Sequence, residues 1–304
     1  MSSAWPSVNY GDWSATCDTL HAHTQVLGKL AVALAAPEPQ FQHTALRLTA
    51  RGWETQLLPA PDGSGAIVAT LDLRRHEALI EHTDGSVRNV ALGPNRSVGE
   101  VTRAVLAAVE EFAGAVSFNP IPQEVAWTVP LDEDEEHHSY DPDQVSAYLA
   151  AATQAALVLA TFRAPYRGRS TPVNAWWGSF DLAVNLFSGQ PAEPPATDYL
   201  MRNAMDAEEV AVGWWPGDQR YAKAAFYVYT YPPREGFPDA SAAPARWDAT
   251  LGEYVLDWDD LRLSPDPRAV ALGFARTVFR HACAVCEWDP TLASSAEGSP
   301  PPLA

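Results

Sequence analysis

Two histidines with polar neighbours are the first candidates for chemistry in this sequence. His21, Gln25 and Lys29 are one helical turn apart, so in a helix they share a polar face that can line a cleft. His137 follows a run of acidic residues, and nearby carboxylates raise an imidazole pKa toward the range of a general acid. We therefore expect His21 and His137 to act in proton transfer. The alternatives are a hydrogen-bonded core histidine and a solvated acidic connector.

An arginine and an aromatic turn add groups that can hold a ligand. Arg51 follows a predicted strand and can clamp a carboxylate or a phosphate, with an ordinary ion pair across the sheet as the alternative. The stretch Trp176-Trp177-Gly178-Ser179-Phe180-Asp181 places a Gly-Ser turn beside indoles and a carboxylate. Such a strand end can form a pocket for a flat ligand, and an aromatic sheet core is the alternative.

Well-defined catalytic and metal-binding motifs are missing from the sequence. It contains no HExxH, GxSxG, GxGxxG or Walker loop. Cys283 and Cys286 form a lone CxxC without the second pair or the histidines that a zinc site needs, so we expect packing thiols. We therefore assign no metal ligands from these motifs; whether a metal is bound stays open, and the cofactor is unknown.

The composition limits the partners and the compartment. The 304 residues include 20 Lys and Arg against 38 Asp and Glu, a net charge of −18, which argues against nucleic acid and anionic membranes as partners. The 47% hydrophobic residues suffice for a large core, and three cysteines fit a reducing compartment. No targeting signal is present, and the longest apolar stretch is shorter than a membrane span. We expect a cytoplasmic protein with a small-molecule ligand; the oligomeric state is not indicated.

The elements that must position these residues follow the same order in both halves. The first half predicts a helix over Asp12–Ala36, short antiparallel strands joined by Asp-Gly turns, and a helix over Ser97–Phe112. Ser97 and Glu100 predict a capping box at the start of the second helix. The second half predicts helices over Asp143–Ala164 and Asp266–Glu287 with strands between them. The predicted fold is α+β, with two similar helix–antiparallel sheet–helix units packed together. The predicted domains are residues 1–118, an acidic connector at 119–142, residues 143–288, and a disordered tail at 289–304.

Several polar and aromatic boxes follow one another along the chain. The boxes are Thr19-Leu20-His21-x-x-Thr24-Gln25, His137-x-Ser139-Tyr140-Asp141, Trp177-Gly178-Ser179-Phe180-Asp181 and Gly213-x-Trp215-Pro216-Gly217. Together they resemble a bacterial family of unknown function. The resemblance covers nearly the whole chain in order, and the family has no assigned activity. It implies that the polar residues of the boxes share a pocket, and it adds Tyr140 and Glu208 to the candidates. The chain departs from the family pattern at Leu186, Gln190 and Ala207, which implies altered specificity or reduced activity if those positions bind substrate.

Two classes of function are open at this point. The first is an enzyme that acts on a small polar or aromatic metabolite in a pocket between the halves, with His21, His137 and Asp181 as catalytic residues. Its substrate-binding residues would be Gln25, Lys29, Arg51, Tyr140, Trp177, Ser179, Glu208 and Trp215. A metal-dependent version would use His21, His137 and Glu208 as ligands. The second is a non-catalytic ligand-binding or protein-interaction module, which a scatter of these residues over separate surfaces would favour.

Overall fold

The structure is a computed structural model and describes residues 5–195 and 199–296. It confirms an α+β fold with two antiparallel sheets. The chain divides into two compact units. The N-terminal unit comprises residues 10–150 and 174–181, and the C-terminal unit comprises the other described residues. The domain boundaries that the sequence suggested at residues 118, 142 and 288 stay a prediction.

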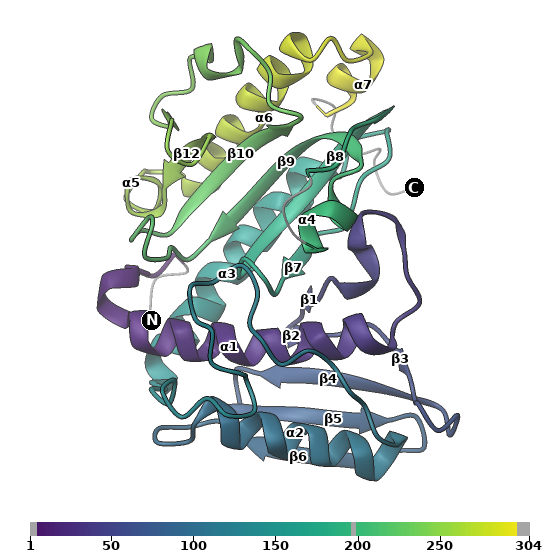
Figure 1. Cartoon of the computed structure of the whole chain (residues 1–304). Coiled ribbons are helices and arrows are strands. Elements are labelled where there is room, and N and C mark those ends of the chain that lie inside the picture. The colour runs from purple at the N-terminus through teal and green to yellow at the C-terminus, as the bar shows by residue number, and fades with distance from the viewer. Residues whose placement is uncertain (1–4, 196–198, 297–304) are drawn as a thin grey trace, which may run out of the picture. The chain divides into compact units, whose positions relative to one another are not determined.

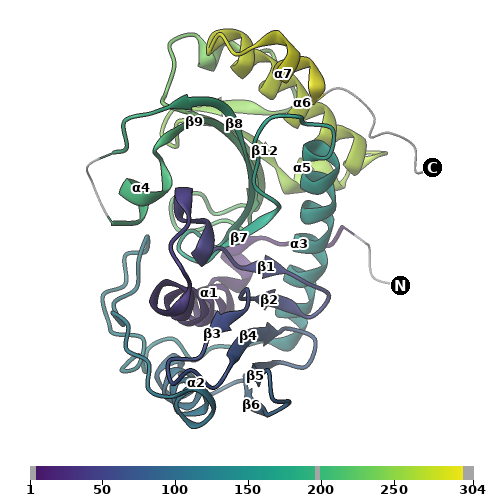
Figure 2. The ribbon, with the colours of Figure 1, turned by 90° about the vertical axis from the view of Figure 1, so that its right-hand side faces the viewer.

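The N-terminal unit has the predicted order of helix, antiparallel sheet and helix (Figure 1). Its elements are α1 (Tyr10–Leu34), η1 (Pro39–Thr44), β1 (Arg47–Leu48), β2 (Gly52–Glu54), β3 (Leu58–Pro59), β4 (Ala66–Asp72), β5 (Glu77–His82), β6 (Val87–Ala91), α2 (Val98–Ala113) and β7 (Asn174–Trp176). The strand order is β1-β2-β4-β5-β6, and β3 also pairs with β4. Figure 2 shows α1 and α2 along this sheet, and both helices contact its strands.

Local sequence signals explain these elements. Ile67, Ala69 and Leu71 alternate along β4 and are at most 1% exposed, because they face the core. The hydroxyl of Ser97 accepts a hydrogen bond from the backbone of Glu100, whose side chain bonds back, so the predicted capping box at the start of α2 is confirmed. The core therefore lies between the helices and one face of the sheet.

The acidic connector belongs to the N-terminal unit. No helix or strand occurs between Gly114 and Asp141, as its prolines predict. Its backbone is instead hydrogen-bonded to other segments: Gln123 pairs with Gln25 of α1, and Asp134 accepts from Gly99 at the start of α2. The connector is thus a structural part of this unit.

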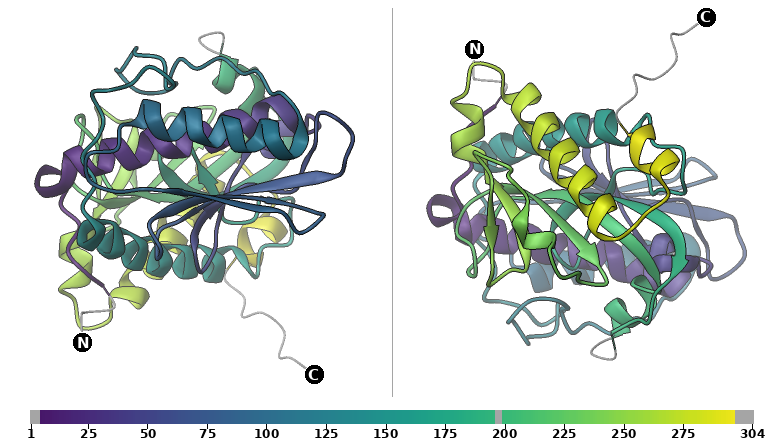
Figure 3. Two further views of the ribbon diagram at one scale, coloured as in Figure 1. Left: turned by 90° about the horizontal axis from the view of Figure 1, so that it is seen from below. Right: turned by 90° about the horizontal axis from the view of Figure 1, so that it is seen from above.

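The C-terminal unit holds the second antiparallel sheet. Its elements are the later part of α3 (Pro142–Arg163), β8 (Asp181–Pro191, from its second residue), α4 (Tyr199–Ala204), β9 (Ala207–Trp215), β10 (Ala225–Tyr231), η2 (Phe237–Asp239), β11 (Arg246–Asp248), β12 (Glu253–Asp257), α5 (Trp258–Arg262), α6 (Pro267–Val285) and α7 (Pro290–Ser295). The strands follow the order β11-β12-β10-β9-β8, and α6 lies across them (Figure 3).

The end of the chain differs in part from the predicted disordered tail. Residues 290–295 form α7, because Asp289 caps the backbone N–H of Thr291 and Pro290 suits the first helical turn. The tail prediction is therefore corrected for this segment. Residues 297–304 lie outside the described residues.

Helix α3 is, within residues 5–195 and 199–296, the one helix long and apolar enough to cross a membrane by length and composition. Core helices of soluble proteins share these properties. Buried residues recur at three- and four-residue spacing along it, at positions 145, 148, 152, 155, 159 and 162. That stripe is typical of a helix packed in a protein core and is consistent with a soluble protein.

Candidate functional site

Asp134 and His137 form a hydrogen-bonded pair near the end of the acidic connector. The ring Nδ1–H of His137 donates to Asp134 Oδ2 at 2.7 Å. Asp134 Oδ1 accepts the backbone N–H groups of Glu136 and His137 at 2.9 and 3.0 Å. The carboxylate is 1% exposed, whereas the His137 side chain is 15% exposed. The carboxylate therefore fixes the ring orientation and, in the neutral ring, leaves Nε2 as the basic nitrogen.

The basic nitrogen of His137 is available. Among residues 5–195 and 199–296, no side chain or backbone group is hydrogen-bonded to His137 Nε2. A carboxylate that orients an imidazole whose second nitrogen is unoccupied is the usual arrangement of a general base. The pair thus has the geometry for proton transfer at Nε2.

The start of α2 holds this segment in place. The backbone N–H groups of Val98 and Gly99 donate to the carbonyl oxygens of His137 and Asp134 at 2.9 and 2.8 Å. These N–H groups have no partner within their own helix, so the connector satisfies them. A Cβ on Gly99 would lie 3.1 Å from both the backbone N and O of Asp134, and glycine permits the close approach. The pair is therefore positioned by backbone contacts and not only by its own hydrogen bonds.

The two partners shift each other's protonation. The hydrogen bond that His137 donates to Asp134 raises the pKa of His137, burial opposes that shift, and the charges of Asp134 and Asp18 support it. Burial pushes the pKa of Asp134 upward, but the hydrogen bonds from His137 outweigh it and hold that pKa below its usual value. The ring is therefore protonated up to a higher pH than a free imidazole, beside a fixed negative charge.

The indole of Trp127 contacts both His137 and His21. Its ring centroid is 4.5 Å from that of His137 and 5.2 Å from that of His21. The two predicted catalytic histidines therefore both pack against one half-buried indole. His23, which is 2% exposed, lies near the pair, and its Nδ1 has no hydrogen-bond partner among the described residues. Burial lowers the pKa of His23 to about 4, although the charge of Asp134 opposes that shift.

His21 has a structural role in this geometry. Its Nε2 lies 3.0 and 2.9 Å from the carbonyl oxygens of Trp177 and Gly178, so this nitrogen carries a proton and donates to both. The neighbouring amide nitrogen of Gln25 at 3.3 Å is then a second donor and forms no hydrogen bond with it. The imidazole also stacks on Phe180 at 5.0 Å. His21 thus clamps the aromatic turn instead of presenting Nε2 to a ligand.

Gln25 and Lys29 anchor the beginning of the connector. The Gln25 amide accepts from the backbone N of Gln123 at 3.0 Å and donates to its carbonyl oxygen at 2.7 Å. Lys29 is 3% exposed, and its Nζ lies 3.4 Å from Gln123 Oε1 and 5.6 Å from the ring centroid of Trp177. Burial lowers the pKa of Lys29 to about 8. Gln25 is therefore fully engaged, whereas Lys29 keeps a weakly bonded amine.

The aromatic turn is packed directly onto α1. A Cβ on Gly28 would lie 2.0 Å from Cγ of Trp177, so only glycine lets the indole lie against the helix. Phe180 adopts a φ of 57°, a conformation that a bulky residue adopts only at some energetic cost. Ser179 Oγ donates to Asp181 Oδ1, and Asp181 is 5% exposed. Trp177 and Phe180 thus belong to the core, whereas Ser179 is exposed and bonds to Asp181.

Tyr140 and Arg51 do not join the histidines. The hydroxyl of Tyr140 lies 3.1 Å from Nδ1 of His76, in the turn between β4 and β5. Arg51 forms an ion pair with Glu81 at 3.1 Å, and its side chain is 48% exposed. The ion pair across the sheet, which was the alternative for Arg51, is present.

Glu208 and Trp215 lie in the C-terminal unit. Glu208 is 6% exposed and forms an ion pair with Arg234 at 2.8 Å. The Trp215 ring packs against Tyr221 and Tyr227 at 5.5 and 5.4 Å. The neighbour of Glu208, Glu209, is 3% exposed and accepts from Asn185 at 2.8 Å, and burial raises its pKa to about 7. These contacts give Glu208 and Trp215 partners inside their own unit.

No group of three His, Cys, Asp or Glu side chains in the described part of the chain is arranged to hold a metal ion. A family described as "Family of unknown function (DUF5996)" matches residues 5–295. The chain belongs to this family. No curated protein and no solved structure matched it. The family assignment therefore confirms the resemblance to a family of unknown function, and membership in DUF5996 carries no activity with it.

Sequence reasoning did not single out four residues that shape the site of this DUF5996 chain. They are Asp134, Trp127, Gln123 and His23. Asp134 is one of five consecutive acidic residues, and nothing in that run distinguishes the buried one. Trp127 carried a usable signal, because an indole in a proline-containing polar connector is unusual unless it packs.

Proposed function

We propose that this protein is an enzyme in which His137 is the general base and Asp134 is the residue that positions it. The observation that carries the proposal is the 2.7 Å hydrogen bond from His137 Nδ1 to a buried carboxylate, with Nε2 left without a partner among the described residues. The basic nitrogen would take a proton from a hydroxyl group or from water bound to the substrate.

The substrate class that fits best is a small polar or aromatic metabolite. Trp127 is half-buried beside His137, and an indole face suits a planar substrate group. Lys29 adds a buried amine that can pair with an acidic group, since its Nζ has one long hydrogen bond, to Gln123, and no ion pair among the described residues. The acidic charge of the chain makes nucleic acid an unsuitable substrate, and a cytoplasmic location is part of this proposal.

The alternative is a non-catalytic binding or interaction module. In that case the Asp134–His137 pair only fastens the connector to α2. The commitment of His21 and Gln25 to backbone groups favours this alternative, because two predicted site residues then serve the fold.

The experiment compares turnover by three proteins of equal stability. Purified wild type, His137→Asn and His138→Asn are incubated with a mixture of small metabolites, and mass spectrometry follows which compounds disappear. His138 is the matched control, because it is the exposed neighbour of His137. The proposal predicts conversion by the wild type and His138→Asn and a loss of about 100-fold or more in His137→Asn. Equal conversion by all three proteins would contradict it, and binding without conversion would favour the module.

A further inference from the structure

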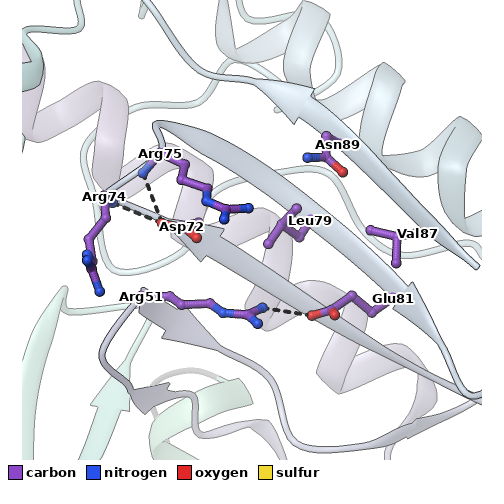
Figure 4. A pocket seen from close by; sticks show the side chains of 8 residues that line it. All are labelled: Arg51, Asp72, Arg74, Arg75, Leu79, Glu81, Val87 and Asn89. Atoms are coloured by element: carbon purple, nitrogen blue, oxygen red, sulfur yellow. Dashed lines mark hydrogen bonds and ion pairs between the residues drawn. The ribbon is translucent and has the colours of Figure 1, made fainter. Parts of the chain in front are cut away.

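A second candidate site lies on the sheet of the N-terminal unit, away from His137. A depression of about 520 Å³ opens there, and Figure 4 shows the side chains that line it. Its position follows from strand β6, where Val87 and Asn89 line the depression while Arg88, between them, bonds to Glu111 of α2. Because alternate residues of a strand face opposite sides, the depression is on the face away from α2. The volume is in the range of sites for small metabolites.

Three arginines from two separate turns line this depression. Arg51 comes from the turn between β1 and β2, and Arg74 and Arg75 come from the turn between β4 and β5. The chain has only 20 Lys and Arg in 304 residues. Three of them line this depression together with two carboxylates, Asp72 and Glu81, so the lining carries a net charge of 3 − 2 = +1 in an acidic protein. Guanidinium groups offer paired N–H donors that match the two oxygens of a carboxylate or phosphate.

The carboxylates at the depression leave much of this positive charge available. Asp72 Oδ1 accepts the backbone N–H groups of Arg74 and Arg75 at 3.0 and 2.9 Å, so this carboxylate fixes the turn instead of pairing with a guanidinium. Arg75 is 3.8 Å from Glu77, the limit of an ion pair, and its side chain is 73% exposed. The Arg74 guanidinium forms no ion pair or hydrogen bond among the described residues. Only Arg51, bonded to Glu81 at 3.1 Å, is closely paired.

The floor of the depression supplies apolar contact. Leu79 is 5% exposed and Val87 is 50% exposed, and both line the site. Asn89 adds a polar amide, one hydrogen of which goes to Glu77 at 2.9 Å. A ligand with an acidic group and a short carbon body would therefore match both the arginines and the floor.

We propose that this depression binds a small molecule carrying a phosphate or carboxylate group, held by Arg51, Arg74 and Arg75. The site goes beyond the proposed enzyme function, because it shares no residue with the Asp134–His137 pair. When the ligand binds, the Arg51 guanidinium leaves its ion pair with Glu81 and pairs with the acidic group of the ligand. Glu81 therefore competes with the ligand for Arg51.

The test measures binding of two probes to the full chain by titration calorimetry at low ionic strength. Inorganic phosphate and succinate are titrated separately, with chloride at matched ionic strength as the reference, and so distinguish the two acidic groups. The proposal predicts saturable binding of at least one probe. Arg74→Gln/Arg75→Gln and Arg51→Gln should each weaken it by about tenfold or more, and Glu81→Gln should tighten it.

The matched control is Arg88→Gln, since Arg88 is an exposed arginine on the opposite face of the same sheet. It should leave binding unchanged, and so should His137→Asn. Absence of saturable binding by both probes would overturn the proposal. An equal loss in Arg88→Gln and in the double variant would also overturn it, because the effect would then be general electrostatic attraction. Binding that persists while His137→Asn abolishes turnover separates this site from the proposed enzyme site.

Discussion

Asp134 holds His137 at two points, through the ring Nδ1 at 2.7 Å and through the backbone N–H at 3.0 Å. One buried carboxylate thus fixes both the position of the chain and the orientation of the ring. Because the pKa of His137 is raised in the fold, protonation of His137 stabilises the protein; this contribution is fully present below pH 6.5 and is lost as the pH rises through the folded pKa. Asp134 has the opposite pH dependence. Because its pKa is lowered in the fold, its contribution to stability is present above its usual pKa and is lost as the pH falls through the folded pKa.

Replacing Asp134 by Asn should lower the pKa of His137, because the largest cause of its raised value is removed. NMR titration of the imidazole protons measures this directly. Glu136→Gln is the control, since the side chain of Glu136 is exposed and only a minor contributor to the shift. An unchanged His137 titration in Asp134→Asn would show that the hydrogen bond does not set the protonation of the ring.

His23 should make the protein less stable in mild acid. Burial lowers its pKa from 6.5 to about 4, and the facing groups are Asp134, Arg96 and His137. Between these values the unfolded chain binds the extra proton, so stability falls as the pH falls from 6.5 to 4, by on the order of 3 kcal/mol. Urea unfolding of the wild type and His23→Leu at pH 7 and pH 5 tests this. The free energy of unfolding should fall less between pH 7 and pH 5 in the variant than in the wild type. An equal fall in both proteins would contradict a lowered pKa of His23 as its cause.

Glu209 of the C-terminal unit should make the protein less stable as the pH rises, which is the opposite of the pH dependence that His23 causes. Burial raises its pKa from 4.5 to about 7, so stability falls as the pH rises through this range, by on the order of 3 kcal/mol. Glu209→Gln keeps the shape and a partner for Asn185 without the charge. The variant should therefore be more stable than the wild type at pH 8, with little difference at pH 4.5. A variant that is less stable at pH 8 would show that the carboxylate is needed in its ionised form.

Replacing two helical glycines by alanine should change the stability of the protein in opposite directions. A Cβ on Gly28 would lie 2.0 Å from Trp177, so Gly28→Ala should destabilise the protein by about 1–3 kcal/mol. Gly273 of α6 has nothing within 4 Å of the same position, so Gly273→Ala should stabilise it by roughly 0.5–1 kcal/mol. Thermal unfolding of both variants measures this, and equal effects would contradict the close packing of the indole on α1.

Patterns of neighbouring residues in the sequence predicted the helices better than the contacts of the candidate site. The capping box of Ser97 and the helix over Asp143–Ala164 follow from neighbouring residues, and the structure has both, the second as α3. The role of His21 is not local, because its carbonyl partners at Trp177 and Gly178 are 156 and 157 residues away. His137 could be proposed from its carboxylate neighbours. Which of the five acidic residues becomes its partner depends on how the backbone of this segment is bonded to the start of α2, and the acidic run does not show that.

The pH dependence of turnover tests the central role of His137 most directly. With a substrate from the metabolite mixture, kcat/KM is measured against pH for the wild type and Asp134→Asn. If His137 is the base, the rate rises with pH through its titration, because only the neutral ring accepts a proton. The midpoint should move to lower pH in Asp134→Asn together with the NMR titration of His137 and with a lower maximal rate. A profile with the same midpoint in both proteins, while the NMR titration shifts, would contradict the account.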